Sequence, residues 1–139
     1  MKKMSIEEFY QRPTSELKAA SLWGGSQVVV NDDNSLSFIV EVEECHMNLH
    51  GTLQASMQYH ISDTLVGMYL IHIGRPGVGM DGHIYLYRPG KLGDTLTATI
   101  FPRKIGRRTG NLATELRNQD GKLISECVFS VMFDEEKAK

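Results

Sequence analysis

The sequence predicts an α+β fold in which a mostly antiparallel sheet of five to six strands curls around one long helix. One apolar segment, from about residue 53 to residue 72, has the length and pattern of a buried helix. Runs rich in β-branched residues stand on both sides of it and are joined by short polar turns. Connections of hairpin length can join only antiparallel strands, so the sheet is expected to be mostly antiparallel.

Length and composition indicate a single domain over residues 1–139, of ordinary globular character. The net charge of −2 argues against a general nucleic-acid or membrane-surface partner. Cys45 and Cys127 show no C-x-x-C spacing, so neither a disulfide framework nor a zinc site is expected. A reducing compartment suits two such cysteines, and we expect a cytoplasmic protein.

Turn and capping signals set the order of the elements. Ser5 to Glu8 form a capping box, which predicts a helix start within a helical segment of about residues 5–21. Gly74 to Gly77 end the central helix, and Asn118 to Gly121 form a hairpin turn. Strands are expected at residues 27–31, 36–42, 82–88, 95–104, 110–117 and 122–133, followed by a frayed charged tail at 135–139.

Asp63 is the one carboxylate inside the predicted central helix. Burial makes a carboxylate costly and raises its pKa, which suits a general base or a nucleophile. The alternative is an ion pair with His60, three residues earlier on the same helix face. His46, His50 and His60 do not place three ligands on one helix face, so no metal is expected.

Several short motifs resemble, in the same order, those of the 4-hydroxybenzoyl-CoA and phenylacetyl-CoA thioesterase superfamily of hotdog folds. Members carry N-x-x-G-x-x-H-G-G with an acidic residue nine positions after the histidine, and Asn48, Gly51 and Asp63 match this frame. The run from Leu86 to Asp94 resembles the family's Y-L-R-P-A-x-x-G-D. Further similar runs are Gly106 to Thr109 and Asp120 to Ile124, and the likeness covers about residues 28–133. The family's H-G-G is replaced by Gln54-Ala55-Ser56.

The resemblance implies an acyl-CoA thioesterase, with coenzyme A entering as part of the substrate and no separate cofactor. Asp63 would attack the thioester or activate a water. The N–H of Ala55, at the helix start, would polarise the thioester carbonyl, unless Ala55 is only a good helix former. Asn48 would hydrogen-bond the carbonyl or orient a water, or else cap its own loop. Gln54 cannot act as a base and is given a polar positioning role.

Helix geometry adds an expectation about assembly. Ala55 and Asp63 are eight residues apart, or about 12 Å along a helix axis, so one carbonyl cannot contact both in one chain. A symmetric homodimer, alone or within a tetramer, would bring Ala55 of one subunit near Asp63 of the other. The family resemblance implies the same arrangement.

Four basic residues flank a predicted turn and are candidates for binding the phosphates of coenzyme A: Arg103, Lys104, Arg107 and Arg108. The alternative is that they are solvated turn charges.

Two other functions are weighed against the thioesterase. The first is a non-catalytic acyl-CoA or acyl-ligand binding protein, favoured by the Gln54-Ala55-Ser56 replacement. The second is a hotdog dehydratase, which needs a catalytic histidine where Gln54 stands.

Overall fold

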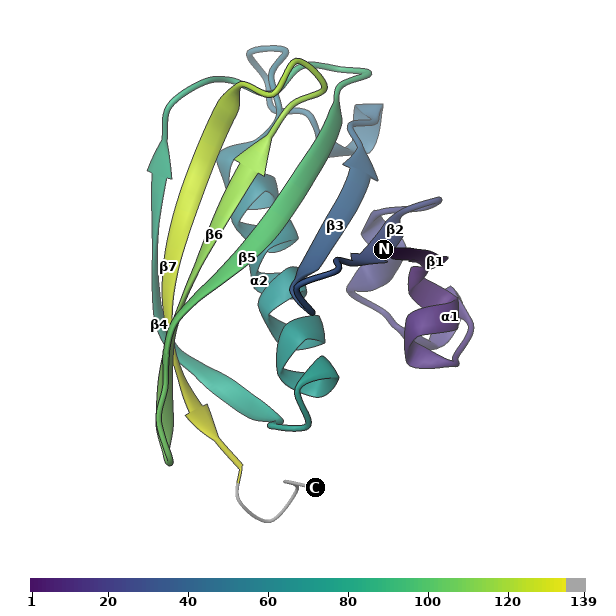
Figure 1. The fold of residues 1–139 in the computed structure, drawn as a ribbon. Helices are drawn as coiled ribbons and strands as arrows, with labels where there is room; N and C mark the ends of the chain where they lie inside the picture. Colours follow the sequence, from purple (N-terminus) through teal and green to yellow (C-terminus); the bar gives the residue numbers. More distant parts are fainter. Residues whose placement is uncertain (135–139) are drawn as a thin grey trace.

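The computed structural model describes residues 1–134, in which a seven-stranded antiparallel sheet curves around the helix α2 (Figure 1). The tail predicted at residues 135–139 lies outside the described residues. The strands lie in the order β1-β2-β3-β5-β6-β7-β4. The elements are β1 (Lys2–Ser5), α1 (Ile6–Tyr10), the 3-10 turns η1 (Thr14–Glu16) and η2 (Ala20–Leu22), β2 (Gln27–Val30), β3 (Leu36–Glu41), η3 (Glu44–His46), α2 (Ala55–His72), β4 (Gly77–Leu86), β5 (Thr95–Ile105), β6 (Thr109–Arg117) and β7 (Leu123–Phe133).

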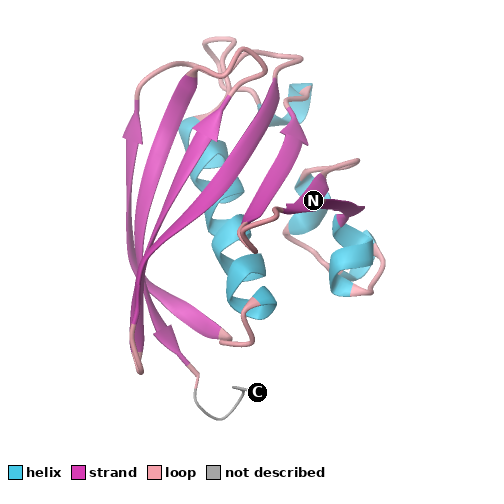
Figure 2. Cartoon of the chain, viewed as in Figure 1, coloured by secondary structure: helices cyan, strands magenta, loops and turns pink. Residues whose placement is uncertain are grey.

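The predicted fold class is confirmed: α2 is the long helix, and it lies in the hollow of the curved sheet (Figure 2). Ile61, Leu65 and Met68 recur on one face of α2 and have no exposed surface. Burying each of these side chains contributes about 1.5–3 kcal/mol. The helix therefore holds its position through a continuous apolar face against the sheet.

The number of strands is a correction, because the sheet has seven strands and not five to six. The additional strand is β1, which pairs with β2 through partners such as Lys3 and Val29. Its sequence is short and charged and carries no strand pattern; the pairing alone makes it a strand. The capping box that follows is confirmed, since the Glu8 N–H donates to Ser5 Oγ (3.1 Å) and the Ser5 N–H to Glu8 Oε2 (3.0 Å).

The structure also corrects two predicted boundaries of these elements. The central helix begins at Ala55, two residues later than expected, because the Leu53 N–H donates to the Gly90 carbonyl (2.9 Å) and is not helical. Strand β4 begins at Gly77 and not at Gly82, because Gly77 and Gly79 already pair with β7. At Gly82 a Cβ would lie 2.3 Å from the hydroxyl oxygen of Tyr59, so a larger residue here would require the Tyr59 side chain to move.

The two edges of the sheet differ in a way that bears on assembly. Strand β1 has four residues and carries Lys2 and Lys3, which protect an edge from further pairing. Strand β4 has ten residues and exposes apolar side chains, with Val78 62% and Met80 50% exposed. Within residues 1–134, no helix is both long and apolar enough to cross a membrane.

Candidate functional site

The loop before α2 is held by the side chain of Asn48. Its Oδ1 accepts from the N–H groups of His50 (2.9 Å) and Thr52 (3.1 Å), and its Nδ2 donates to Thr52 Oγ1 (2.9 Å). This is the loop-capping arrangement, one of the two roles expected for Asn48. It places a half-buried amide directly before the helix start.

In the first turn of α2, two backbone donors have no hydrogen-bond partner among residues 1–134. The Gln54 carbonyl accepts from the N–H groups of Met57 (2.9 Å) and Gln58 (3.3 Å), and no side chain caps the helix. The N–H groups of Ala55 and Ser56 therefore remain at the positive end of the helix dipole. The Gln54 side chain turns aside and donates to Ser56 Oγ (2.5 Å).

A cavity of about 320 Å³ opens at this helix start. It forms because the loop after β4 packs against Leu53, where a Cβ on Gly90 would lie only 2.8 Å from the Leu53 Cβ. The structure thus brings Asn48 and Ala55 together at one cavity. The other lining residues are Thr52, Leu53, Gln58, Leu86, Tyr87, Arg88 and Pro89.

Gln58 is a cavity residue that the sequence analysis did not single out. It is 2% exposed, and its Oε1 has no hydrogen-bond partner among the described residues. A polar residue one turn after Ala55 on an apolar helix was the available signal, but its burial is a tertiary property. Arg88, on the loop after β4, was also missed as a lining residue.

Asp63 lies further along α2, and its side chain is exposed on the surface of the single chain, which corrects the expectation of a buried carboxylate. Tyr59, one turn earlier, packs against Phe129 with ring centroids 5.4 Å apart. Burial raises the pKa of Tyr59, and the negative charge of Asp63 raises it further. Partial burial of its carboxylate still raises the pKa of Asp63, and nearby His60 partly opposes this rise. Asp63 does not line the cavity at Ala55, as its distance along the helix requires.

The side chain of His60 is hydrogen-bonded to the N-terminal segment. Buried Trp23 donates its Nε1–H to His60 Nδ1 (2.9 Å), so a neutral His60 carries its proton on Nε2. Burial lowers the pKa of His60. The negative charge of Asp63 raises this pKa, and His46 lowers it further. The alternative ion pair between His60 and Asp63 is not found among residues 1–134.

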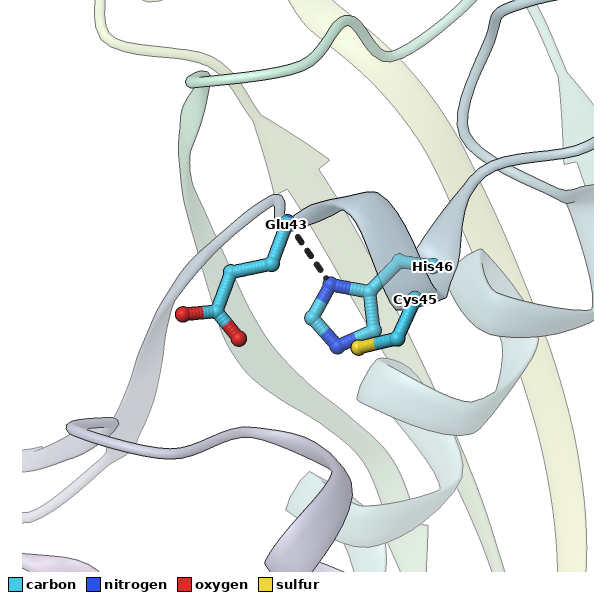
Figure 3. A group of neighbouring side chains, drawn as sticks. All are labelled: Glu43, Cys45 and His46. Atoms are coloured by element: carbon cyan, nitrogen blue, oxygen red, sulfur yellow. Dashed lines mark hydrogen bonds between the residues drawn. The ribbon is translucent and has the colours of Figure 1, made fainter.

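Glu43, Cys45 and His46 place three potential metal ligands close together (Figure 3). Both ring nitrogens of His46 are engaged, however. Nδ1 accepts from the Glu43 N–H (2.9 Å), and Nε2 then donates to the Leu22 carbonyl (2.5 Å). His46 also stacks on Trp23, with ring centroids 3.9 Å apart. The ring anchors the N-terminal segment to this loop and has no free nitrogen for a metal.

The predicted phosphate-binding residues lie away from the cavity. Lys104, Arg107 and Arg108 are exposed at the β5–β6 turn, at the opposite end of the molecule from the start of α2 (Figure 1). Arg75, just after α2, fixes this turn by donating Nη2 to the carbonyls of Gly106 (3.0 Å) and Arg107 (2.9 Å). One chain therefore does not bring these cations together with Asn48 and Ala55.

Comparison with known families agrees with this fold. The model of the thioesterase superfamily matches residues 49–125, more than half of the chain, so the chain belongs to that superfamily. Comparison with curated protein sequences returns no match.

Three solved structures illustrate the fold. The E. coli PaaI protein from the phenylacetic acid degradation operon has 22% identity and a TM-score of 0.78, covering 94% of this chain and 96% of its own. A hypothetical thioesterase from Streptococcus pneumoniae TIGR4, solved with coenzyme A, has 22% identity and a TM-score of 0.75, covering 79% and 89%. The smu.793 protein from Streptococcus mutans UA159, bound to acetyl CoA, has 23% identity and a TM-score of 0.75, covering 81% and 90%.

Proposed function

We propose that this protein is an acyl-CoA thioesterase. The observation that carries the proposal is that α2 supplies both an unpaired N–H at a cavity, from Ala55, and a carboxylate of raised pKa, Asp63. Membership of the thioesterase superfamily and the coenzyme A ligands of two structural relatives support the same substrate class.

In the proposed reaction, the thioester carbonyl oxygen accepts a hydrogen bond from the Ala55 N–H, where negative charge develops on attack. Asp63 either attacks the carbonyl carbon, giving a mixed anhydride that water then hydrolyses, or takes a proton from an attacking water. In both routes the C–S bond breaks, the thiolate of coenzyme A leaves and takes up a proton, and the carboxylic acid is released.

The site is completed by a second copy of the chain. Ala55 and Asp63 are about 12 Å apart along α2. Strand β4 is a long edge strand that exposes Val78 and Met80, so we expect a strand of another chain to pair with it. Antiparallel pairing of two β4 strands sets two α2 helices antiparallel, so that Ala55 of one subunit approaches Asp63 of the other.

A non-catalytic acyl-CoA binding protein is the second candidate. The observation that favours it is Gln54, whose exposed amide is turned onto Ser56 and cannot accept a proton at neutral pH. Such a protein would keep the cavity and the fold and lack turnover.

The deciding experiment is a panel of aryl- and fatty-acyl-CoA substrates, followed by release of the free thiol and, in parallel, by calorimetric binding. We expect hydrolysis of at least one member of the panel by the purified wild-type protein. Binding without turnover would replace the thioesterase by the binding protein. Neither binding nor turnover across the panel would overturn both.

The basic turn provides a separate prediction. In the antiparallel dimer, the β5–β6 turn of one subunit lies toward the helix start of the other, where coenzyme A phosphates would extend. Changing Arg107 and Arg108 together to Ala should raise KM for an acyl-CoA more than for a short pantetheine thioester, because only the former carries phosphates.

The matched control changes Arg12 and Lys18 to Ala, which removes two exposed positive charges from the N-terminal segment. This control should leave the ratio of the two KM values unchanged. Equal effects of the Arg107 and Arg108 changes on both substrates would mean that these arginines are solvated turn charges.

A further inference from the structure

The carboxamide oxygen of Gln58 has no hydrogen-bond partner within residues 1–134. The residue is 2% exposed, its Oε1 is buried, and no group within residues 1–134 bonds it. An unpaired buried amide lowers the stability of the folded state. A methionine or leucine would fill the same helical position without this cost. Packing and stability therefore give no reason for a glutamine here.

The location of Gln58 supplies a reason. It stands three residues after Ala55, on the same face of α2 and about 4.5 Å further along the axis. Both residues line the same cavity. Asn48 and Thr52, which also line the cavity, already hydrogen-bond each other. Within residues 1–134, the Ala55 N–H and the Gln58 carboxamide oxygen therefore have no hydrogen-bond partner at this cavity.

We propose that Gln58 recognises the bound ligand by hydrogen-bonding a hydroxyl or amide group held about one helical turn from the thioester carbonyl. The inference rests on the proposed function, because the Ala55 N–H fixes where that carbonyl lies. A carboxamide both donates and accepts, and so do hydroxyl and amide groups. An apolar group of the same size leaves Gln58 unpaired, which makes Gln58 a specificity-determining residue.

This chemistry has two sources in an acyl-CoA. The pantetheine arm places an amide a few bonds from the thioester sulfur in every acyl-CoA. A hydroxyl on the acyl chain is present only in some. Three ligands separate these sources: acetyl-CoA, a straight-chain acyl-CoA, and the 3-hydroxyacyl-CoA of the same length.

The test compares Gln58→Met with the unchanged cavity by titration calorimetry, both in the Asp63→Asn background so that ligands are not consumed. Methionine keeps the length and flexibility of glutamine and removes both hydrogen-bonding atoms. We expect about a tenfold or greater loss of affinity. A loss confined to the hydroxyacyl ligand assigns the contact to the acyl group. An equal loss for all three ligands assigns it to the pantetheine amide.

The melting temperature of the ligand-free protein supplies a second readout. Gln58→Met should raise Tm by a few degrees, because an unpaired buried amide is removed. Ser26→Ala is the matched control, since Ser26 also has a buried, unpartnered hydroxyl and does not line the cavity. The control should raise Tm and leave all three affinities unchanged.

Two results would overturn the role of Gln58. Unchanged affinity of Gln58→Met for all three ligands would show that no ligand contact is lost. A lower Tm of the ligand-free variant would show that the carboxamide has a structural partner in the assembled protein. If the chain with Gln58 intact binds none of the three ligands, the proposed function itself fails, a result separate from the first two.

Discussion

Asp63→Asn is expected to lower kcat for hydrolysis of any accepted acyl-CoA by about a hundredfold or more. Asparagine keeps the shape of the side chain and can neither attack the thioester nor take a proton from water. Losses of a nucleophile or general base are of this size or larger. Asp120→Asn, on the exposed β6–β7 turn, is the matched control and should keep full activity. An Asp63→Asn protein as active as wild type would remove Asp63 from the mechanism.

The same variant should be more stable at neutral pH. Partial burial raises the pKa of the otherwise exposed Asp63 in the folded state, so the fold favours the protonated carboxyl. Its stabilising contribution is present below the ordinary pKa of about 3.9 and is lost as pH rises through the raised value. Neutral Asn avoids that loss, so Tm of Asp63→Asn should exceed wild type at pH 7, with the difference shrinking toward pH 4. An inactive but more stable protein excludes misfolding as the cause of lost activity.

The parts of the fold that the sequence predicted are those that local pattern determines. The face of α2 with Ile61, Leu65 and Met68 follows helical periodicity, and the capping box at Ser5 is a local hydrogen-bond pattern. Strand β1 was missed because its pairing partner, not its own residues, makes it a strand. The start of α2 was misplaced because Leu53 bonds a loop 37 residues later, at Gly90.

The candidate site also has parts that a local sequence pattern predicts and parts that depend on tertiary structure. Asn48 and Ala55 were predicted because they stand at fixed positions in one short motif, and the structure places both at one cavity. Gln58 was missed because its burial and its lack of a partner are tertiary properties. The bond between Trp23 and His60 joins segments 37 residues apart, and no local pattern predicts it. The position of Arg107 far from the cavity could not be predicted either, because the composition of a turn does not indicate how far it lies from another part of the fold.

A mixed dimer tests whether the site is shared between subunits. One chain carries Asp63→Asn and the other carries Ala55→Pro, which removes the N–H that would hold the carbonyl oxygen. The structure makes the proline change mild for folding, because Ala55 is the first helical residue, a position where proline is favoured. Gln54 before it is extended (φ −61°, ψ 135°), as a residue preceding proline must be.

Each homodimer should be inactive, and the heterodimer should regain about half of wild-type activity, since one site has both lesions and the other has neither. Two different affinity tags isolate the heterodimer before assay. Ala55→Gly, which keeps the N–H, is the control for loss of the methyl group and should stay active. If Ala55 and Asp63 of one chain formed each site, every site in the heterodimer would carry one lesion. A purified heterodimer with no activity, beside an Asp63→Asn and wild-type heterodimer with half activity, would therefore contradict the shared site.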